Sequence, residues 1–522
     1  MAGKTAVLGI DVGTQGVKVG LFTAQGNCVA TGRAEYETFY PQPGWAEQDA
    51  NDWWKATKQA VKACLDSNPN LSIEGICLCA TSSTVVCVDR EGTPLAPAIM
   101  WMDTRAVQEA QQVTQTNHPV LRYSGGEVSP EWMLPKTLWI KKNNPQLYRR
   151  SYKIVEQLDW LNYLLTGKWV ASQCNATCKW NYSSMDGGWQ EDFYREAGLE
   201  DYEDIWPTEV IPMGGKIGSL TPTAASELGL REGIPVFQGG IDAYTGMLGM
   251  GVVEEGLIAI VMGTSFVHLA LSSRPIFQEG MWGPYPAAIL PGQWVLEGGQ
   301  TSGASVANWV VAETVREFNE DPGKAHALLI NEAARLKPGS EGVISIDMWQ
   351  GNRTPFRDPL ISGVIAGLTL KAQRVHLYRS ILESVAYGTK AVVDVFIRNG
   401  YPLRGIIACG GPTRNKLWVQ IIADVLQIPL QIPEFSEAGI LGCAILVSSG
   451  LGWFRTIKEA AKAFVKVSST IQPDRDVADE YTFYYHCYLD LYHAVKPILH
   501  RIYHHRAQPE EVFPCKKDIS WK

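Results

Sequence analysis

The chain has 522 residues, which is too long for one hydrophobic core, so we expect about two to four domains. Its formal net charge is −8 and no basic stretch offsets that charge, which argues against a nucleic-acid or anionic-membrane partner. The eleven cysteines are scattered, without a Cys-x-x-Cys pair, as is typical of reduced thiols in a cytoplasmic protein.

The first predicted elements are two apolar strands, residues 6–12 and 16–22, joined by the turn Gly-Thr-Gln-Gly. A strand that begins by about residue 5 leaves no room for a signal peptide. Asp11 lies at the inner end of the first strand, where a charge is costly unless it is paired or meets a cation. Backbone amides in a glycine turn beside a carboxylate suit a polyphosphate with its magnesium ion. An ordinary hairpin with an exposed acid fits the same residues.

Further along, residues 28–37 predict a third strand, and a helix with Asp49 or Asn51 as its cap follows. The helix is predicted because apolar residues recur at helical spacing over residues 53–64. Residues 73–95 then predict strand, turn and strand, with a reversal at Glu91-Gly92. Strands with an inserted helix indicate a mixed-sheet α/β fold.

The second half repeats this pattern. Residues 257–272 predict strand, turn and strand, residues 375–398 a helix that stops at Gly400, and residues 405–433 strand, Gly-Gly turn, helix and strand. The apolar stretch over residues 257–271 is too broken by polar residues to span a bilayer. We therefore predict a duplication, with domains at 1–247 and 248–478 and a cleft between them. Residues 479–522 are predicted as a helical extension whose Tyr and His side chains are packing and surface groups.

Two later glycine turns resemble the first in chemistry. Gly263, Thr264 and Ser265 follow one strand, and Gly410-Gly411 follow another strand that ends at Cys409. A helix starts near Asn415, so backbone amides and a helix N-terminus can lie near the phosphates or ribose of a nucleotide. One such turn is weak support for a nucleotide site, but three in this order on matching domains are much stronger.

Asp242 follows an apolar strand and a Gly-Gly bend, and it precedes a helix start rich in small residues. A carboxylate there can accept a proton from a substrate hydroxyl, or it can simply cap the helix. The segment 130–202 is rich in tryptophan, which usually means core packing. Trp101 and Trp180 fit either a pocket wall or the core.

Taken together, the motifs resemble the FGGY carbohydrate kinases of the actin/hexokinase/Hsp70 superfamily, from about residue 6 to 470. The resemblance rests on "GIDVGTQGVKVGLF", "GWAEQDANDWW", "IMWMDTRA", "GGIDAYTGMLG", "VMGTSF", "GNRTPFRDP" and "CGGPTRNKLWVQIIADVLQIPL" followed by "SEAGILGCAI". Within the family, "CATSSTVVCVD", "YSGGEVSPEWMLPKTLWI" and "QCNATCKWNY" are similar to the ribulokinase branch of pentulose kinases.

This resemblance implies an α/β fold of two duplicated actin/hexokinase-like (ribonuclease H-like) domains with a central cleft. It implies Asp11 as the magnesium ligand and Asp242 as the general base. The implied ATP-binding residues are Gly13, Thr14, Gln15, Gly263, Thr264, Ser265, Gly410, Gly411 and Asn415. The implied sugar-binding residues are Thr81, Ser82, Ser83, Asp103, Lys179 and Asp242. Gln15 stands where many relatives have Ser, so its contact with phosphate is open.

The expected function is ATP-dependent phosphorylation of a small sugar hydroxyl, with D-ribulose as the best single substrate. L-Ribulose, L-xylulose, erythritol and a signalling sugar-like diketone stay as alternatives. The "TSST" segment argues against D-xylulose, and the lack of an Arg-Glu pair argues against glycerol. A non-catalytic actin-like nucleotide sensor is the alternative of another class, opposed by the set Asp11, Asp103, Asp242 and Lys179. The partners expected are ATP, Mg²⁺ and the sugar, and relatives suggest a homodimer.

Overall fold

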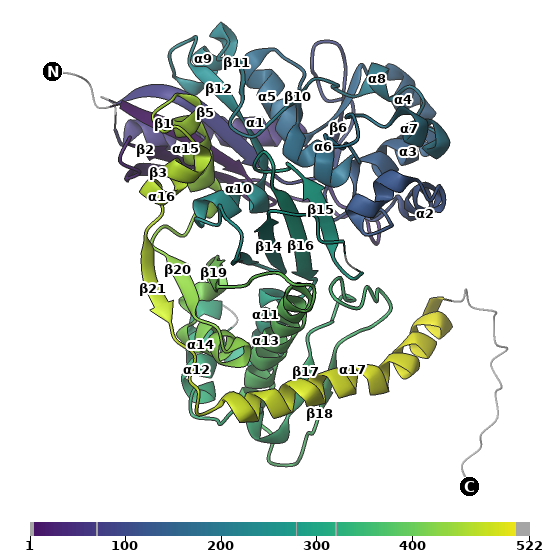
Figure 1. Cartoon of the computed structure of the whole chain (residues 1–522), viewed down its shortest axis with the longest axis vertical. Helices are drawn as coiled ribbons and strands as arrows, with labels where there is room; N and C mark the ends of the chain where they lie inside the picture. The colour runs from purple at the N-terminus through teal and green to yellow at the C-terminus, as the bar shows by residue number, and fades with distance from the viewer. Residues whose placement is uncertain (1–4, 69–70, 278, 319–320, 508–522) are drawn as a thin grey trace.

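The computed structural model describes residues 5–68, 71–277, 279–318 and 321–507. Two large sheets form the two bodies seen in Figure 1. The first has the order β11-β12-β5-β1-β2-β3 and the second the order β15-β16-β14-β13-β19-β20-β21. The strands of the first are β1 (Thr5–Val12), β2 (Gly16–Phe22), β3 (Cys28–Glu35), β5 (Ser72–Ala80), β11 (Lys216–Ser219) and β12 (Pro235–Ile241). Those of the second are β13 (Leu257–Met262), β14 (Phe266–Ser272), β15 (Trp282–Pro286), β16 (Trp294–Gln300), β19 (Gly405–Cys409), β20 (Leu430–Pro433) and β21 (Val467–Ile471).

Both sheets share one internal order. In the first, β1 pairs antiparallel with β2 and β2 with β3, while β5 runs parallel to β1 and β12 parallel to β5. In the second, β13 pairs antiparallel with β14 and β14 with β16, while β19 runs parallel to β13 and β20 parallel to β19. The predicted duplication of a strand-turn-strand α/β unit is therefore confirmed. The turns after β1 and β13 occupy equivalent places in the two sheets.

Helix α1 (Ala50–Asp66) covers the first sheet at β2 and β3. It begins where predicted because the Asp49 side chain accepts a hydrogen bond from the N–H of Asn51, which satisfies a free amide of the first turn. Its apolar face, which includes Trp53 and Val61, is fully buried. The helix approaches closely at Gly32, where a Cβ atom would lie 2.1 Å from the carbonyl oxygen of Ala60.

A small sheet of the order β4-β7-β6-β8, whose strand β4 precedes β5 in the chain, and several short helices between β5 and β12 form a lobe beside the first sheet. Many of its aromatic residues form one cluster, in which the ring centroids of Trp180 and Trp206 lie 5.0 Å apart. Trp180 is fully buried, so of its two predicted roles the core role is confirmed. The elements are β4 (Glu47–Gln48), β7 (Ala98–Ile99), β6 (Val85–Val88), β8 (Lys153–Glu156), α2 (Val107–Gln115), α3 (Met133–Asn143), α4 (Pro145–Arg150), α5 (Gln157–Thr166), α6 (Gln173–Lys179), α7 (Glu191–Ala197), α8 (Tyr202–Ile205) and α9 (Pro222–Leu228).

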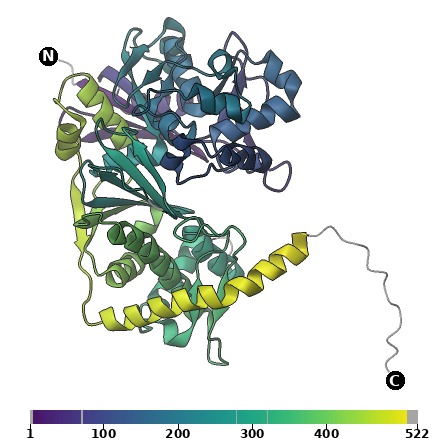
Figure 2. The same ribbon diagram turned by 45° about the vertical axis from the view of Figure 1, so that its right-hand side comes forward.

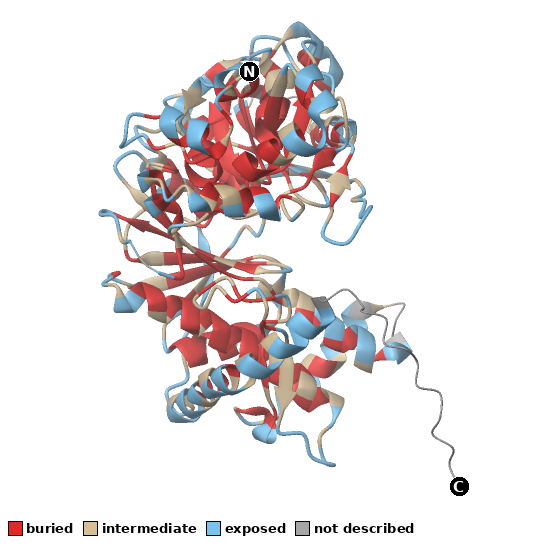
Figure 3. Cartoon of the chain, turned by 90° about the vertical axis from the view of Figure 1, so that its right-hand side faces the viewer, coloured by how far each residue is buried: buried red, intermediate tan, exposed pale blue. Residues whose placement is uncertain are grey.

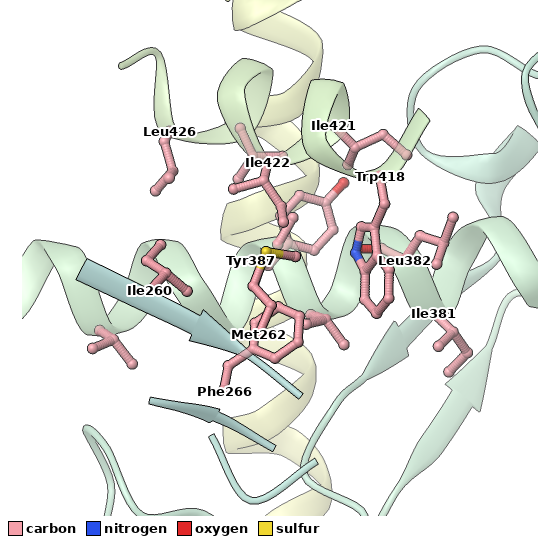
Figure 4. Close-up of a cluster of buried hydrophobic side chains, with 14 of the residues drawn as sticks. Ile260, Met262, Phe266, Ile381, Leu382, Tyr387, Trp418, Ile421, Ile422 and Leu426 are labelled. Atoms are coloured by element: carbon pink, nitrogen blue, oxygen red, sulfur yellow. The ribbon is translucent and has the colours of Figure 1, made fainter. Parts of the chain in front are cut away.

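Helices α13 (Arg374–Arg398) and α14 (Lys416–Leu426) build the second core. Figure 4 shows Phe266 of β14 and Trp418 of α14 together with residues of α13, and their ring centroids lie 5.6 Å apart. The indole N–H of Trp418 donates to the carbonyl of Leu382, so this buried polar group is satisfied. Helices α11 (Ala304–Thr314) and α12 (Pro322–Ala333) and the pair β17 (Ile344–Ile346) and β18 (Val364–Ala366) complete this body.

Two helices pack tightly where the two halves of the chain meet. Helix α10 (Asp242–Gly249) crosses α15 (Ala438–Gly450), and α15 also packs on β1 and β5 of the first sheet. A Cβ atom at Gly442 would lie 2.0 Å from the carbonyl oxygen of Thr245, and one at Gly249 would lie 2.0 Å from that of Ala438. Figure 3 shows buried residues continuing through both bodies. Helix α16 (Ile457–Phe464) packs against α15.

The predicted C-terminal helix is present as α17 (Ala478–Ala507), and the rest of the predicted extension, 508–522, lies outside the described residues. In Figures 1 and 2 it crosses the body that contains the second sheet and projects beyond it. Several tyrosine hydroxyls of the helix form hydrogen bonds to that body. For example, the hydroxyl of Tyr488 donates to a carboxylate oxygen of Asp347 at 2.7 Å. No helix of the described ranges is long and apolar enough to cross a membrane.

Candidate active site

A cavity of about 650 Å³ lies between the two sheets and is lined by residues from both halves of the chain. Its polar lining comes from strand ends, turns and helix starts. Of the residues singled out from the sequence, it is lined by Asp11, Thr14, Thr81, Ser82, Lys179, Asp242, Gly263, Thr264, Ser265, Gly410 and Gly411. Gly13, Gln15, Ser83, Asp103 and Asn415 are not among the lining residues.

The two equivalent turns have the same sequence pattern, Gly-Thr followed by a polar residue. The N–H of Gly13 donates to the carbonyl of Gly16, and that of Gly263 donates to the carbonyl of Ser265, each at 3.0 Å. All three residues of the second turn line the cavity, whereas the first contributes Thr14 and leaves Gln15 exposed. Hydroxyls and backbone amides from both sheets thus meet in one space, which suits a chain of phosphate groups.

The third turn requires glycine for a steric reason. Gly410 has φ +117°, and a Cβ atom there would lie 2.0 Å from the carbonyl oxygen of Met262. Gly411 starts a short 3₁₀ helix, and Asn415 caps α14 by accepting the N–H of Trp418 at 3.1 Å. The side chain of Asn415 therefore has a capping role, while the two glycines leave the cavity open beside it.

Asp11 lies near the end of β1 and faces the start of α15. A Cβ atom at Gly439 would come within 2.5 Å of Oδ2 of Asp11, so glycine at that position keeps this oxygen accessible. Oδ1 accepts a weak hydrogen bond from the thiol of Cys79 at 3.6 Å. Burial raises the pKa of Asp11, and the positive charge of Lys18 partly offsets that effect. A recessed carboxylate with an open oxygen beside phosphate-binding turns fits one ligand of a magnesium ion.

Asp242 is the first residue of α10, one position inside the helix, and Ile241 is the capping residue. Its Oδ1 accepts the N–H of Ala243 at 2.7 Å. Burial raises its pKa to about 7, and the charge of Asp11 adds to the rise. A carboxyl group with that pKa can hold and release a proton near neutral pH, as a general base must.

Opposite the turns, the cavity has a second polar region. Nζ of Lys179, from the end of α6, lies 3.3 Å from Oε2 of Glu297 on β16. The hydroxyl of Tyr244 donates to the same oxygen at 2.6 Å. Nζ of Lys179 also lies 5.2 Å from the ring centroid of Trp132. An ammonium group, a carboxylate and an aromatic wall are groups that bind a polyhydroxy compound.

The predicted residue Asp103 is fully buried and does not line the cavity. Its Oδ1 accepts the backbone N–H and Nε of Arg105, each at 2.9 Å, and its Oδ2 accepts the N–H of Ala46 and an Nη of Arg105, each at 2.7 Å. Both oxygens are therefore occupied within the protein. The structure does not bring this carboxylate together with the cavity-lining groups.

Ser83 does not line the cavity either, but its backbone takes part in holding the cavity wall. Its carbonyl accepts a hydrogen bond from Nζ of the buried Lys136 at 2.8 Å, and the carbonyl of Met100 accepts another at 2.6 Å. Burial lowers the pKa of Lys136 to about 7. This lysine ties together the segments that bring Thr81, Ser82 and Trp101 to the cavity.

Sequence reasoning missed several charged residues that line the cavity: Lys18, Arg33, Glu131, Glu297, Arg353, Arg414 and Glu437. Glu297 had a usable signal, because it is an acid within an apolar strand and is followed directly by Gly-Gly. A Gly-Gly pair also ends the apolar strand that leads to Asp242. Lys18 pairs with Glu437 at 2.6 Å, and Arg353 pairs with Glu131 at 3.0 Å. These two pairs join residues far apart in the chain, so no local pattern reveals them.

Comparisons with known proteins agree with this geometry. The N-terminal domain of the FGGY family of carbohydrate kinases matches residues 6–249, and its C-terminal domain matches residues 258–450. An FGGY carbohydrate kinase domain-containing protein of Xenopus laevis is 35% identical over 528 residues, covering 93% of this chain and 96% of the relative. A ribulokinase of Geobacillus thermodenitrificans is 30% identical over 519 residues, covering 90% and 91%.

Solved structures show the same arrangement. The xylulose kinase from Rhodospirillum rubrum superposes with a TM-score of 0.84 at 26% identity, over 95% of this chain and all of that one. The glycerol kinase of Plasmodium falciparum with ADP gives a TM-score of 0.81 at 20% identity, which is a likeness of fold. The predicted two-domain actin/hexokinase-like fold is confirmed by these neighbours and by the duplicated sheets.

Proposed function

Because the chain belongs to the FGGY family of carbohydrate kinases and is an ATP-dependent sugar kinase, we propose that it phosphorylates a ketopentose, with D-ribulose as the preferred substrate. The ribulokinase relatives support ribulose without distinguishing its D and L forms, and the resemblance of the motifs over residues 75–185 favours D-ribulose. L-Ribulose, L-xylulose, erythritol and a sugar-like diketone are the competing substrates. A xylulose kinase of Staphylococcus epidermidis, 27% identical over 497 residues, keeps D-xylulose on the panel to be tested.

One observation carries the proposal: Asp242 lines a single cavity together with the two Gly-Thr turns and with the Lys179–Glu297 pair. A nucleotide held by the turns would present its terminal phosphate toward the middle of this cavity. A small polyol held by Lys179 and Glu297 would present a hydroxyl to the same place. Phosphoryl transfer depends mainly on such placement and on charge stabilisation.

In the proposed reaction, Asp242 accepts the proton of the sugar hydroxyl. The hydroxyl oxygen forms a bond to the γ-phosphorus of ATP, while the bond from that phosphorus to the bridging oxygen breaks and ADP leaves. Thr14, Thr264 and the amides of the glycine turns would hold the phosphate oxygens in line. Asp11 would hold Mg²⁺, which neutralises phosphate charge when it is bound. Among the described residues there is no group of three or more His, Cys, Asp or Glu side chains that could hold a metal ion.

The assay that tests the function measures ADP release from Mg-ATP alone and with D-ribulose, L-ribulose, D-xylulose, L-xylulose or erythritol. A sugar kinase of this class should be stimulated strongly by one or two of them, with formation of the sugar phosphate. ATP turnover indifferent to every sugar would favour a non-catalytic nucleotide sensor instead. If D-ribulose gives no stimulation while another sugar gives a strong one, that other sugar replaces D-ribulose as the proposed substrate, and the enzyme class is unchanged.

The pH dependence should follow Asp242. Its pKa is raised from 3.8 to about 7, so in the free enzyme it is protonated below that pH and cannot accept a proton. We expect kcat/KM for D-ribulose to rise tenfold per pH unit below about pH 7 and to level off above it. Lys18 lowers this pKa, so Lys18→Met should move the midpoint to higher pH. A flat profile from pH 5 to 8 would contradict the assignment of the base.

Lys179 should act mainly on the sugar. Replacing it by methionine removes hydrogen-bond donors from the polar region of the cavity while keeping the aliphatic volume. We expect the KM for D-ribulose to rise by about 10- to 100-fold, with the KM for ATP changed by less than about threefold. Steady-state kinetics in both substrates measure this difference. Lys62→Met, at an exposed position of α1, is the matched control.

We further propose a reducing compartment and a homodimer. The described cysteines are unpaired, which supports a reducing compartment such as the cytoplasm. A homodimer is proposed from the resemblance alone, and light scattering on the purified protein tests it.

A further inference from the structure

The motif "GNRTPFRDP" forms residues 351–359, here named the arginine loop, which joins the two halves of the chain beside the cavity. An Nη of Arg353 lies 3.0 Å from both carboxylate oxygens of Glu131, and both residues line the cavity. Nη1 of Arg357 donates to Glu127 at 2.9 Å and to the carbonyl of Gly125 at 3.0 Å. Two arginines of the second half therefore hold the segment 125–131 of the first. Trp132, beside Lys179, follows that segment directly.

The arginine loop is also fixed to the strand that carries Glu297. The N–H of Thr354 donates to the carbonyl of Gly299 at 3.2 Å, and the hydroxyl of Thr354 accepts the N–H of Gly299 at 3.3 Å. The hydroxyl of Thr301 donates to the carbonyl of Gly351 at 2.6 Å. These bonds hold the first part of the loop. The second part, after Pro355, is joined to the first by the N–H of Asn352, which donates to the carbonyl of Asp358 at 2.8 Å, and it is also held from outside the loop.

Helix α17 fixes that second part. Asp358 is 3% exposed, and a carboxylate so buried needs partners. Nε2 of His500 lies 2.8 Å from its Oδ1, and the hydroxyl of Tyr492 donates to its Oδ2 at 3.1 Å. The ring of Tyr492 also stacks on Phe356, with centroids 4.1 Å apart and planes 16° apart. Nζ of Lys496 lies 3.6 Å from Oδ2 of Asp358.

We propose that α17 is a positioning element of the substrate site. Through Asp358 and Phe356 it sets the arginine loop so that Arg353 and Arg357 hold the segment 125–131 and Trp132 against the cavity. The C-terminal family match ends at residue 450, so α17 adds this role from outside the matched domain. The consequence for catalysis rests on the proposed function: a closed wall keeps the sugar in and water out.

The first test is hydrogen exchange on the ligand-free full-length protein and does not depend on activity. Asp358→Asn removes the negative charge of the carboxylate that His500 and Tyr492 contact. We expect about tenfold faster amide exchange in residues 351–359 and also in residues 125–131 on the other half of the chain. Tyr485→Phe is the matched control, because it removes an α17 hydroxyl bonded at 2.8 Å to Asp394 and spares the arginine loop.

Faster exchange at 351–359 with unchanged exchange at 125–131 would overturn the proposal, as would equal effects of Tyr485→Phe and Asp358→Asn. If Asp358→Asn does not fold, His500→Gln gives the same comparison at a partly exposed residue, and exchange there decides the question in the same way.

The second test uses kinetics with D-ribulose and with the other sugars of the panel. For Asp358→Asn we expect the sugar KM to rise about tenfold, and the ADP formed per sugar phosphate to increase because water enters. A general loss of stability would instead lower kcat without changing that ratio, and such a result would count against positioning. If no sugar stimulates the wild type, the proposed function fails, while the exchange experiment still decides the role of α17.

Discussion

Replacing Asp242 by asparagine is expected to lower kcat for sugar phosphorylation by about 10²- to 10⁴-fold, the usual contribution of a general base. Asparagine has the same shape and can still accept the N–H of Ala243, so the start of α10 should be unchanged. The measurement is initial-rate kinetics with D-ribulose and Mg-ATP.

The affinity for ATP separates a role in chemistry from a role in folding. The turns that contain Thr14, Thr264 and Gly411 do not depend on the Asp242 side chain, so the Kd for ATP measured by calorimetry should change by less than about threefold. Transfer at nearly the wild-type rate by Asp242→Asn would show that another group accepts the proton.

The second large effect is expected at the crossing of α10 and α15. In Gly442→Ala the new methyl group would lie 2.0 Å from the carbonyl oxygen of Thr245, so the two helices must separate. The backbone of α15 fixes the position of this methyl group and the carbonyl oxygen belongs to the backbone of α10, so no rotamer change relieves the contact. We expect a loss of about 1–3 kcal/mol in the free energy of unfolding, despite the better helix propensity of alanine. Urea unfolding followed by circular dichroism measures it.

Gly246→Ala is the matched control for this prediction. This glycine lies at the same crossing, on α10 rather than α15, but a Cβ atom there meets no atom closer than 3.7 Å. We expect no loss of stability from it, and a gain of up to about 1 kcal/mol from helix propensity. Equal destabilisation by the two variants would mean that close approach is not what makes Gly442 necessary.

The sequence predicted those parts of the fold that follow from local patterns. Pairs of apolar runs around Gly-Thr turns predicted both hairpins, and helical spacing after Asp49 predicted α1 with its cap. The placement of α15 over β1 could not be predicted, because it depends on a contact such as that of Gly9 with Ile440 between the two ends of the chain.

The same limit applies to the candidate site. Glycines, threonines and the acids Asp11 and Asp242 stand out because they interrupt apolar strands, and the structure brings them to one cavity. Asp103 was expected only from the family resemblance, and Arg105, two residues later, bonds both of its carboxylate oxygens. The ion pair between Arg353 and Glu131 could not be predicted from neighbouring residues, because its two partners lie more than two hundred positions apart in the chain.

The position of α15 has a consequence for how the polypeptide matures on the ribosome. Val7, Cys77 and Phe237 of the first sheet share one buried cluster with Ile440, Cys443 and Val447 of that helix. Until synthesis reaches the helix, this side of the early sheet lacks the element that covers β1 and β5, and these strands are open to chaperones or to self-association. A nascent chain arrested before residue 438 should therefore bind a dye for apolar surfaces, and completion of the chain should abolish the binding.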